Sequence, residues 1–349
     1  MTLQLTPKHL IIKISIYLIV LAAIMVICTL TGKINPPEGQ RRLSLQKVFT
    51  GPSVQPGDNI DYEIFSVRLR RIFLAVLVGA ALACSGAVLQ AILRNPLADP
   101  YILGISSGAG LGAVIAFISG VAWTSWAGSP ITVFAFIGAM GTVWLVWTIG
   151  HFAGRSQVTS LLLAGVVVNA FFSAVIMFLT SIAKSDQLRK TIYWLMGNIS
   201  DQDSGVLIFS AVCTIGGIIF LFSLSNKLNL LSLGEYEARG LGINTEKTKL
   251  LAFALTAFIT SISVSLCGLI GFVGLIVPHA IRLVSGPDHR QLLPLSAIYG
   301  GIFLAIADTI ARTAFGQEQL PVGVITAITG GPFFLILLAR YTRKVSWMK

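Results

Sequence analysis

Ionisable residues inside apolar stretches are the positions of this chain that are most able to carry chemistry. Asp308 and Arg312 lie four residues apart in one such stretch, where a charged side chain costs about 2.5–3.5 kcal/mol on insertion scales. They could form an ion pair along one helix, or Arg312 could serve a separate function. The histidines stand apart from one another, at His9, His151, His279 and His289, and no hydrolase motif accompanies them. We therefore expect no catalytic site, no metal site and no cofactor.

The stretch most similar to a nucleotide-binding motif is GINTEKT, at residues 242–248. Lys247 and Thr248 match the end of a phosphate-binding loop, but Glu246 occupies the position where that loop needs glycine. A second stretch, SGAGLGA, contains GxGxxA inside an apolar run, where close helix packing explains the small residues better. The chain is therefore not expected to be an enzyme, and any ATP hydrolysis has to occur on a partner.

The composition is that of a membrane protein. Of the 349 residues, 55% are hydrophobic and 11% are charged, and the mean hydropathy is +0.83, whereas an ordinary soluble domain has about 25% charged residues. Membrane lipid is thus the expected surrounding of an all-α, polytopic chain. The net charge of +11 comes from lysines and arginines scattered through short loops, so nucleic-acid binding is not expected.

Apolar runs bounded by charged residues, proline or glycine predict about ten transmembrane helices, since one span needs roughly 20 apolar residues. The predicted spans are 10–31, 66–92, 101–119, 129–151, 158–183, 203–224, 247–267, 270–285, 291–314 and 321–341. All should be helical, because lipid offers the backbone no hydrogen-bond partner. The run 270–285 is short and contains polar residues, so it should lie inside the bundle or be re-entrant.

An even number of spans places both termini on one side of the membrane. The tail carries four positive charges, which favours the cytoplasm. The outer loop 31–65 then contains the amphipathic stretch LSLQKVF, expected to be a short external helix. A second outer segment, about 186–197, contains Tyr193 and Trp194 and should form an interfacial helix. We see no separate soluble domain, so residues 1–349 are predicted to form one transmembrane domain.

Small residues recur every four positions in two spans and predict close helix packing. The two ridges are Gly104, Gly108, Gly112 and Ala116, and Gly79, Ala83, Ala87 and Ala91. The cysteines lie in apolar runs without CxxC spacing and are interpreted as packing residues: Cys28, Cys84, Cys213 and Cys267. Gln90 and Asn169 should line a pathway or bond across helices. The hydroxyl groups of the run 256–265 could contact a polar pore or bond to carbonyls of their own helix.

Two inner segments differ from ordinary loops. Residues 93–101, LRNPLADPY, should make a rigid turn, because two prolines restrict the backbone. Residues 231–243, LSLGEYEARGLGI, contain a helix-forming centre framed by Gly234, Gly240 and Gly242. A short helix that ends at glycine could fit a groove of a partner protein, although a merely solvated loop fits the pattern equally well.

Long ordered stretches of the chain resemble the FecCD family, the permease subunits of bacterial importers for iron-siderophores, haem and vitamin B12. The stretches are RLRRIFLAVLVGAALACSGAVLQAILRNPLADPYILGISSGAGLGA, LLLAG, LGEYEARGLG, GFVGLIVPHAIRLV, DHRQLLP and LPVGVITAITGGPFF. The resemblance implies the type II ABC importer permease fold in the bacterial inner membrane, with ten helices per subunit. It also implies a second permease copy as a homodimer, cytoplasmic ABC ATPase subunits and an extracytoplasmic substrate-binding protein.

The resemblance also implies roles for individual residues. The match to LGExxARxLG implies ATPase coupling by Gly234, Glu235, Ala238, Arg239 and Gly242. The resemblance implies that three outer arginines pair with glutamates of the binding protein when it docks: Arg68, Arg71 and Arg312. One departure is Arg70, which stands where the family often has proline and adds a charge beside Arg71.

The family's mechanism is alternating access driven by ATP binding on the partner. A ferric chelate, siderophore or haem, is the first expected cargo and cobalamin the second. Two other classes remain as alternatives. An ion-coupled secondary transporter would use a carboxylate within a span, for which Asp308 is the candidate. An intramembrane enzyme would need a paired nucleophile and base that we do not find.

Overall fold

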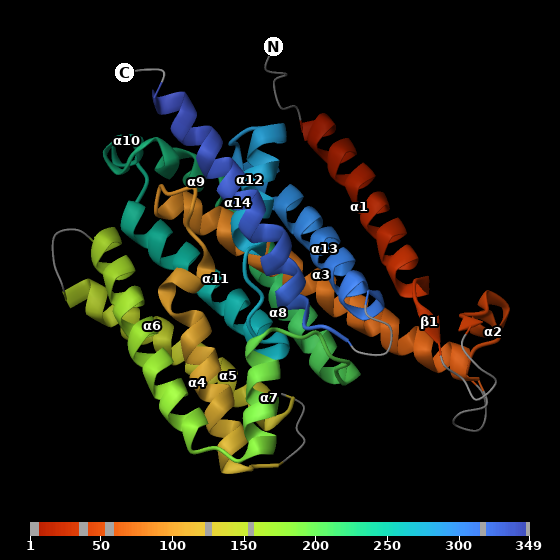
Figure 1. Ribbon diagram of the computed structural model, residues 1–349. Coiled ribbons are helices and arrows are strands. Elements are labelled where there is room, and N and C mark those ends of the chain that lie inside the picture. Colours follow the sequence, from red (N-terminus) through yellow and green to blue (C-terminus); the bar gives the residue numbers. More distant parts are fainter. Residues whose placement is uncertain are drawn as a thin grey trace.

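The computed structural model describes residues 7–34, 41–52, 59–122, 128–152, 157–314 and 319–346, which form a bundle of α-helices (Figure 1). Within this part of the chain, seven helices are long and apolar enough to cross a membrane. They are α1 (Pro7–Leu30), α3 (Ile60–Ile92), α5 (Pro130–Phe152), α6 (Gln157–Ser181), α8 (Ser204–Ser223), α11 (Thr245–Cys267) and α13 (His289–Thr313). Two further apolar helices, α4 (Ile105–Ser119) and α12 (Val273–Ser285), are shorter, and in α14 (Val322–Ser346) the apolar stretch Val322–Ile336 is short as well. These ten helices correspond to the ten predicted spans.

The remaining elements are short. They are α2 (Leu45–Phe49), the 3₁₀ helix η1 (Pro100–Leu103), α7 (Ser185–Leu195), α9 (Ser225–Leu233), α10 (Glu235–Gly240), and the antiparallel two-residue strands β1 (Lys33–Ile34) and β2 (Arg41–Arg42). Figure 1 shows α9 and α10 at the end where α1 starts and α14 finishes, whereas α2 and α7 lie toward the opposite end. The amphipathic stretch LSLQKVF is thus helical in its second part, as predicted.

Side-chain caps explain where several helices begin. At α11, Asn244 Oδ1 accepts a hydrogen bond from the backbone N–H of Lys247 (2.9 Å), so the stretch that resembles a phosphate-binding loop is instead a helix N-terminus. Asp288 caps α13 by accepting from the N–H of Arg290 (3.0 Å). Asn59 does the same for α3, which starts at Ile60, six residues before the predicted boundary.

Glycine contacts bring α3 against its neighbours at backbone distance. A Cβ added to Gly86 would lie 1.7 Å from the carbonyl oxygen of Gly274 on α12, and one added to Gly79 would lie 2.1 Å from that of Gly300 on α13. On α4, a Cβ at Gly112 would lie 2.1 Å from the Phe134 carbonyl oxygen on α5. Small residues therefore let α3 lie at the centre of the bundle, where nearly all of its apolar stretch is buried.

The predicted span 101–119 is not one continuous helix. Pro100 starts the turn η1, and Gly104 then takes a φ of +76° before α4 begins. Gly104 thus ends η1 in a left-handed conformation that glycine adopts without strain, while Gly108 of the same ridge lies inside α4 and faces Thr142 and Gly138. Three of the four cysteines are buried, and all four are free.

Polar groups inside the bundle mostly bond to nearby carbonyls. Thr256 donates to the Ala252 carbonyl (2.6 Å) and Ser263 to the Ile259 carbonyl (2.8 Å), so these hydroxyls bond within their own helix. Gln90 bonds across helices, because its Nε2 donates to the Gly274 carbonyl on α12 (3.3 Å). Asn169, in contrast, lies exposed on α6.

Candidate functional site

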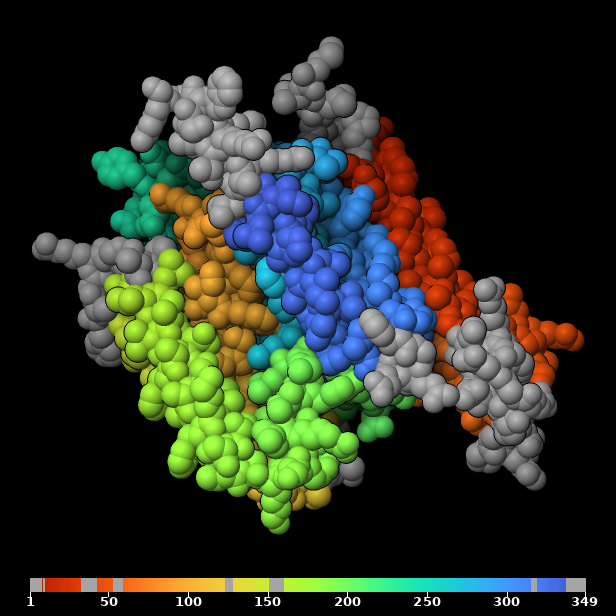
Figure 2. Space-filling model, viewed as in Figure 1, coloured from red at the N-terminus to blue at the C-terminus, as the bar shows by residue number. Residues whose placement is uncertain are grey.

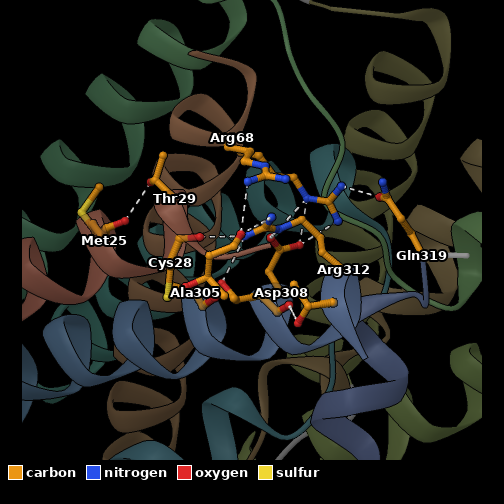
Figure 3. Close-up of polar contacts among 12 residues, drawn as sticks. Met25, Cys28, Thr29, Arg68, Ala305, Asp308, Arg312 and Gln319 are labelled. Atoms are coloured by element: carbon orange, nitrogen blue, oxygen red, sulfur yellow. Dashed lines mark hydrogen bonds and ion pairs between the residues drawn. The ribbon is translucent and has the colours of Figure 1, made fainter. Parts of the chain in front are cut away.

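A cluster of charged residues joins the start of α3 and the end of α13, at the end of the bundle opposite the two termini, which is predicted to be the outer end (Figure 3). At its centre is Asp308, which has no solvent-exposed surface. Arg71 Nε donates to Asp308 Oδ1 (2.9 Å), and Arg71 Nη2 lies 2.8 Å from the same oxygen. Arg312 Nε lies 3.4 Å from Asp308 Oδ2. The ion pair along α13 that the four-residue spacing suggested is therefore present, and Arg71 is a second partner 237 positions away.

Two further arginine contacts tie the end of α1 to this cluster. Arg312 Nη2 donates to the Cys28 carbonyl (2.8 Å), and Arg68 Nη1 donates to the Gly32 carbonyl (3.3 Å). The last carbonyls of a helix lack partners within the helix, and cations near them are favourable. Arg68 and Arg312 thus hold the end of α1 while they contribute positive charge to the outer part of the molecule.

The cluster reaches α7 through Gln319. Arg71 Nη1 donates to Gln319 Oε1 (2.7 Å), and the Gln319 carbonyl accepts a hydrogen bond from the hydroxyl of Tyr193 on α7. Neither contact is visible in the sequence, because the three residues lie far apart along the chain. The outer ends of α3 and α13 are therefore connected to the helix expected at the interface.

The structure brings together all three arginines for which docking was expected. Arg71 and Arg312 have nearly buried side chains, 10% and 7% exposed, and both pair with Asp308. Arg68 and Arg312 lie at the same outer end, and the three arginines with Asp308 leave a net charge of +2. Arg70 lies apart from them and makes a two-point ion pair with Asp201 (2.8 and 2.7 Å). The arginine that replaces the family's proline is thus paired with the segment that follows α7.

The segment 231–243, predicted to lie on the inner side, contains α10, a helix held by side chains at both ends. Ala238 is fully buried, and Glu235 forms an ion pair with Lys249 of α11. Arg239 Nη2 lies 3.2 Å from Glu246 Oε1. These contacts fix α10 against the start of α11 and leave its other face to solvent, where Tyr236 is 89% exposed.

Two glycines give the α10 segment its shape. Gly234 has a φ of +154°, and a Cβ there would lie 1.6 Å from Glu237 Oε2. Gly242 has a φ of +81°, a backbone conformation that residues other than glycine rarely adopt. The glycine-framed helix predicted from the sequence is therefore present, with a fixed start and a left-handed exit.

The Glu235–Lys249 pair lies at the inner end of the bundle and affects the titration of the carboxyl. The hydrogen bond from Lys249 lowers the pKa of Glu235, with a further contribution from the charge of Arg94, against an opposing effect of burial. A lowered carboxyl pKa means that the pair stabilises the fold at neutral pH and that this stabilisation is lost only as the pH falls through the pKa of the folded state. The anchor of α10 is thus charged under physiological conditions.

A ten-helix membrane bundle, with arginines gathered at one end and a glycine-framed helix on the other, defines a multi-pass permease. Among the described residues no group of three His, Cys, Asp or Glu side chains could hold a metal ion. The chain belongs to the FecCD transport family, whose sequence profile matches residues 13–340. It is thus a transport subunit of the ABC importer class, with the type II importer permease fold expected from the sequence.

The names of similar proteins are consistent with this family and mention different cargoes. The cobalamin import system permease protein of Halobacterium salinarum is 44% identical over 273 residues, which are 78% of this chain and 72% of that protein. The hemin transport system permease protein of Yersinia pestis is 40% identical, over 79% of this chain and 82% of that protein. An ABC transporter described as of metal-chelate type, solved in an inward-facing conformation, has a TM-score of 0.80 at 32% identity and covers 96% of this chain and all of its own.

Proposed function

We propose that this permease imports a ferric chelate, a siderophore complex or haem, by alternating access across the bacterial inner membrane. The observation that carries import by alternating access, whichever the cargo, is the placement of two proposed partner-binding surfaces at opposite ends of one bundle: the arginine cluster of α3 and α13, and the helix α10. The solved metal-chelate relative and the haem relative support this cargo.

The outer cluster is the proposed docking site of a substrate-binding protein. Arg68, Arg71 and Arg312 supply positive charge, and a partner's carboxylates would pair with it. Since the side chains of Arg71 and Arg312 are both nearly buried against Asp308, Arg68 is the proposed direct contact. Arg71 and Arg312 act by holding α3, α13 and the end of α1 together. The positive charge would attract the binding protein electrostatically, and the ion pairs would keep the docking surface rigid.

The inner helix α10 is the proposed contact of a cytoplasmic ATPase. Gly234, Glu235, Ala238, Arg239 and Gly242 set its conformation and anchor it to α11, while Tyr236 and Leu241 are exposed. An exposed helix of this kind fits a groove in a partner. Closure of two ATPase subunits would then move α10 and, through its anchor, α11.

A second copy of the permease is the remaining proposed partner, and both termini are proposed to be cytoplasmic. α6 and α14 lie at the surface of the view in Figure 2. Their exposed side chains include Phe171, Met177 and Ile328. A central pathway between two copies would be lined by such helices, and lipid would cover the rest.

Cobalamin is the second candidate cargo. The relatives from Halobacterium salinarum and from Salmonella are named as cobalamin or vitamin B12 import permeases. Import of either cargo would use the same two partner surfaces, so the arrangement of the partner surfaces does not discriminate between the two.

The test is accumulation of labelled ferric siderophore, haem and cobalamin in cells that contain the permease with its ATPase and binding protein. We expect ATP-dependent accumulation of a ferric chelate, and Arg68→Glu should lower its rate about tenfold because a docking charge is reversed. Lys47→Glu on α2 is the matched control and should have little effect. Arg68 is preferable to Arg71, because a glutamate at position 71 would lie against buried Asp308 and disturb the fold.

A compensating change separates docking from damage. Reversal of the facing glutamate on the binding protein to arginine should restore accumulation by Arg68→Glu and impair the wild type. ATP-dependent accumulation of cobalamin alone would replace the proposed cargo by the second candidate. No ATP-dependent accumulation of any cargo, with all subunits present in the membrane, would overturn the proposal.

A further inference from the structure

A hollow of about 510 Å³ lies beside α7 on its outer-side surface. It is bordered by α7, the end of α4, the start of α5, the end of α11 and residues 198–202. Its size falls within the range of about 300–1,000 Å³ that is typical of small-molecule sites. In Figure 2 α7 lies at the surface of the molecule, away from both termini. The hollow is separate from the arginine cluster, although Tyr193 takes part in both.

The two charged residues that line the hollow are both positive. Arg189 and Lys190 of α7 line it, and none of its described lining residues is an aspartate or glutamate. Lys190 has a partner in Asp186 (2.7 Å), whereas we find no ion pair of Arg189 within the described part of the chain. Tyr193 and Trp194 add aromatic faces. Cations beside aromatic rings suit a ligand that is both anionic and flat.

One side of the hollow also has a polar group without a partner. Asn198 Oδ1 is buried and has no hydrogen bond among the described residues, and no hydrogen bond of its Nδ2 group is found there either. Buried polar atoms in native proteins are rarely left unpaired, and an unpaired one needs an explanation, such as a ligand. Since the oxygen and nitrogen of an asparagine amide can exchange places by rotation, Asn198 is able to donate to a ligand oxygen.

The backbone that holds Asn198 is rigid. The Asn198 N–H donates to the Cys267 carbonyl (2.7 Å), and the Gly197 carbonyl accepts from the Gly323 N–H (3.2 Å). A Cβ added to Gly268 would lie 2.1 Å from the Trp194 carbonyl oxygen, so the end of α7 packs directly on the turn after α11. Asn198 is thus held in place before any ligand arrives, which lowers the cost of binding.

We propose that this hollow binds the negatively charged, oxygen-rich rim of the cargo at the outer entrance and so favours anionic ferric chelates over neutral ones. This inference rests on the proposed function, import of a ferric chelate. Arg189 supplies the charge, Tyr193 and Trp194 contact the aromatic groups of the chelate, and Asn198 donates to one of its oxygens. A chelate of the tricatecholate type, which carries three negative charges, fits these groups better than a neutral trihydroxamate or cobalamin.

The experiment measures equilibrium binding to the purified full-length permease in phosphatidylcholine nanodiscs, without partners. The probes are a radiolabelled trianionic ferric tricatecholate and a neutral ferric trihydroxamate. For Arg189→Gln we expect about tenfold weaker binding of the tricatecholate, about the loss of one charged contact, and unchanged binding of the trihydroxamate. Asn198→Ala should also weaken tricatecholate binding. Lys184→Gln, at the start of α7 and outside the hollow, is the control and should bind both chelates like the wild type.

Any one of four results would overturn the proposal. Equal affinity of wild type and Arg189→Gln for the tricatecholate would show that the hollow does not read charge, and equal weakening for both chelates would point to a change in the fold. Abolition of tricatecholate binding by phosphatidylglycerol in the nanodiscs would make the hollow a site for anionic lipid. Uptake in cells separates this inference from the function itself: ATP-dependent uptake of a ferric chelate that is unaffected by Arg189→Gln leaves the proposed function standing and rejects the site.

Discussion

Asp308 shows how one residue can hold several helices together. Its carboxylate faces two guanidinium groups, one from α3 and one from its own helix. Burial of this group is costly unless its charge is neutralised, and removal of one partner of a buried ion pair is more damaging than replacement of the whole pair. Asp308, the carboxylate that would be the candidate for an ion-coupled transporter, therefore holds α3 and α13 together through its two ion pairs.

We expect Asp308→Asn to destabilise the purified permease by about 3 kcal/mol, because Arg71 then remains buried without a counter-ion. Thermal unfolding in detergent measures the effect. Asp201→Asn is the matched control, since it breaks the exposed pair with Arg70 and should cost about 0–1 kcal/mol. Equal losses in the two variants would contradict the structural role assigned to Asp308.

The sequence predicted only part of this cluster. The spacing of Asp308 and Arg312 indicated a pair along α13, because residues four apart share a helix face. The pairing with Arg71 depends on how α3 crosses α13, and no local pattern encodes a contact across 237 positions. The contacts of Gln319 and the open amide of Asn198 were invisible for the same reason.

At the scale of elements, the crossing of α3 and α12 depends on Gly86. We expect Gly86→Ala to destabilise the protein by about 3 kcal/mol or more, since the added methyl overlaps the Gly274 carbonyl and both helices have to separate. Gly216→Ala on α8 is the control, because a Cβ there meets nothing within 4 Å. The yield of folded protein after extraction and its thermal midpoint measure the difference, and a Gly86→Ala protein as stable as the control would refute the close crossing.

The exit of α10 allows a similar comparison. Gly242→Ala has space but an unfavourable φ of +81°, which costs about 1–2 kcal/mol, whereas Gly240→Ala has space and an ordinary backbone. Hydrogen exchange of the amides of 235–243 should be roughly tenfold faster in Gly242→Ala than in the wild type. In Gly240→Ala it should be unchanged or slower, and faster exchange in that variant instead would contradict this account.

Helix positions followed from the sequence because lipid permits little besides apolar helices. The breaks before individual helices, in contrast, could not be predicted from the sequence. Gly104 and Phe272, with φ of +76° and +70°, precede α4 and α12, and such conformations arise from the surrounding packing rather than from local preference. The predicted helix 101–119 was wrong in its first turn for this reason, while α10 was predictable because glycines frame it directly in the sequence.

At the scale of the whole molecule, the arginine cluster and α10 lie at opposite ends of the bundle. The orientation of the chain in the membrane therefore decides which partner each surface meets. We expect green fluorescent protein fused to either terminus to fluoresce, because both termini are predicted to be cytoplasmic, and alkaline phosphatase at the same positions to be inactive. The same reporters inserted after Gly51, in the outer segment, should give the reverse result. Active phosphatase at one terminus only would contradict the even number of crossings.

Helix α3 connects these two ends directly. Its 33 residues span about 50 Å at 1.5 Å per residue, whereas the hydrocarbon layer is about 30 Å thick. Arg71 lies about a third of the way along it from its start, and the proline-containing turn follows its end. A rigid rod of this length behaves as a lever: a tilt of about 10° around its midpoint displaces each end by about 4 Å in opposite directions. A small push at the proposed docking surface would thus arrive at the opposite end of the bundle as a movement comparable to one residue's spacing along the chain.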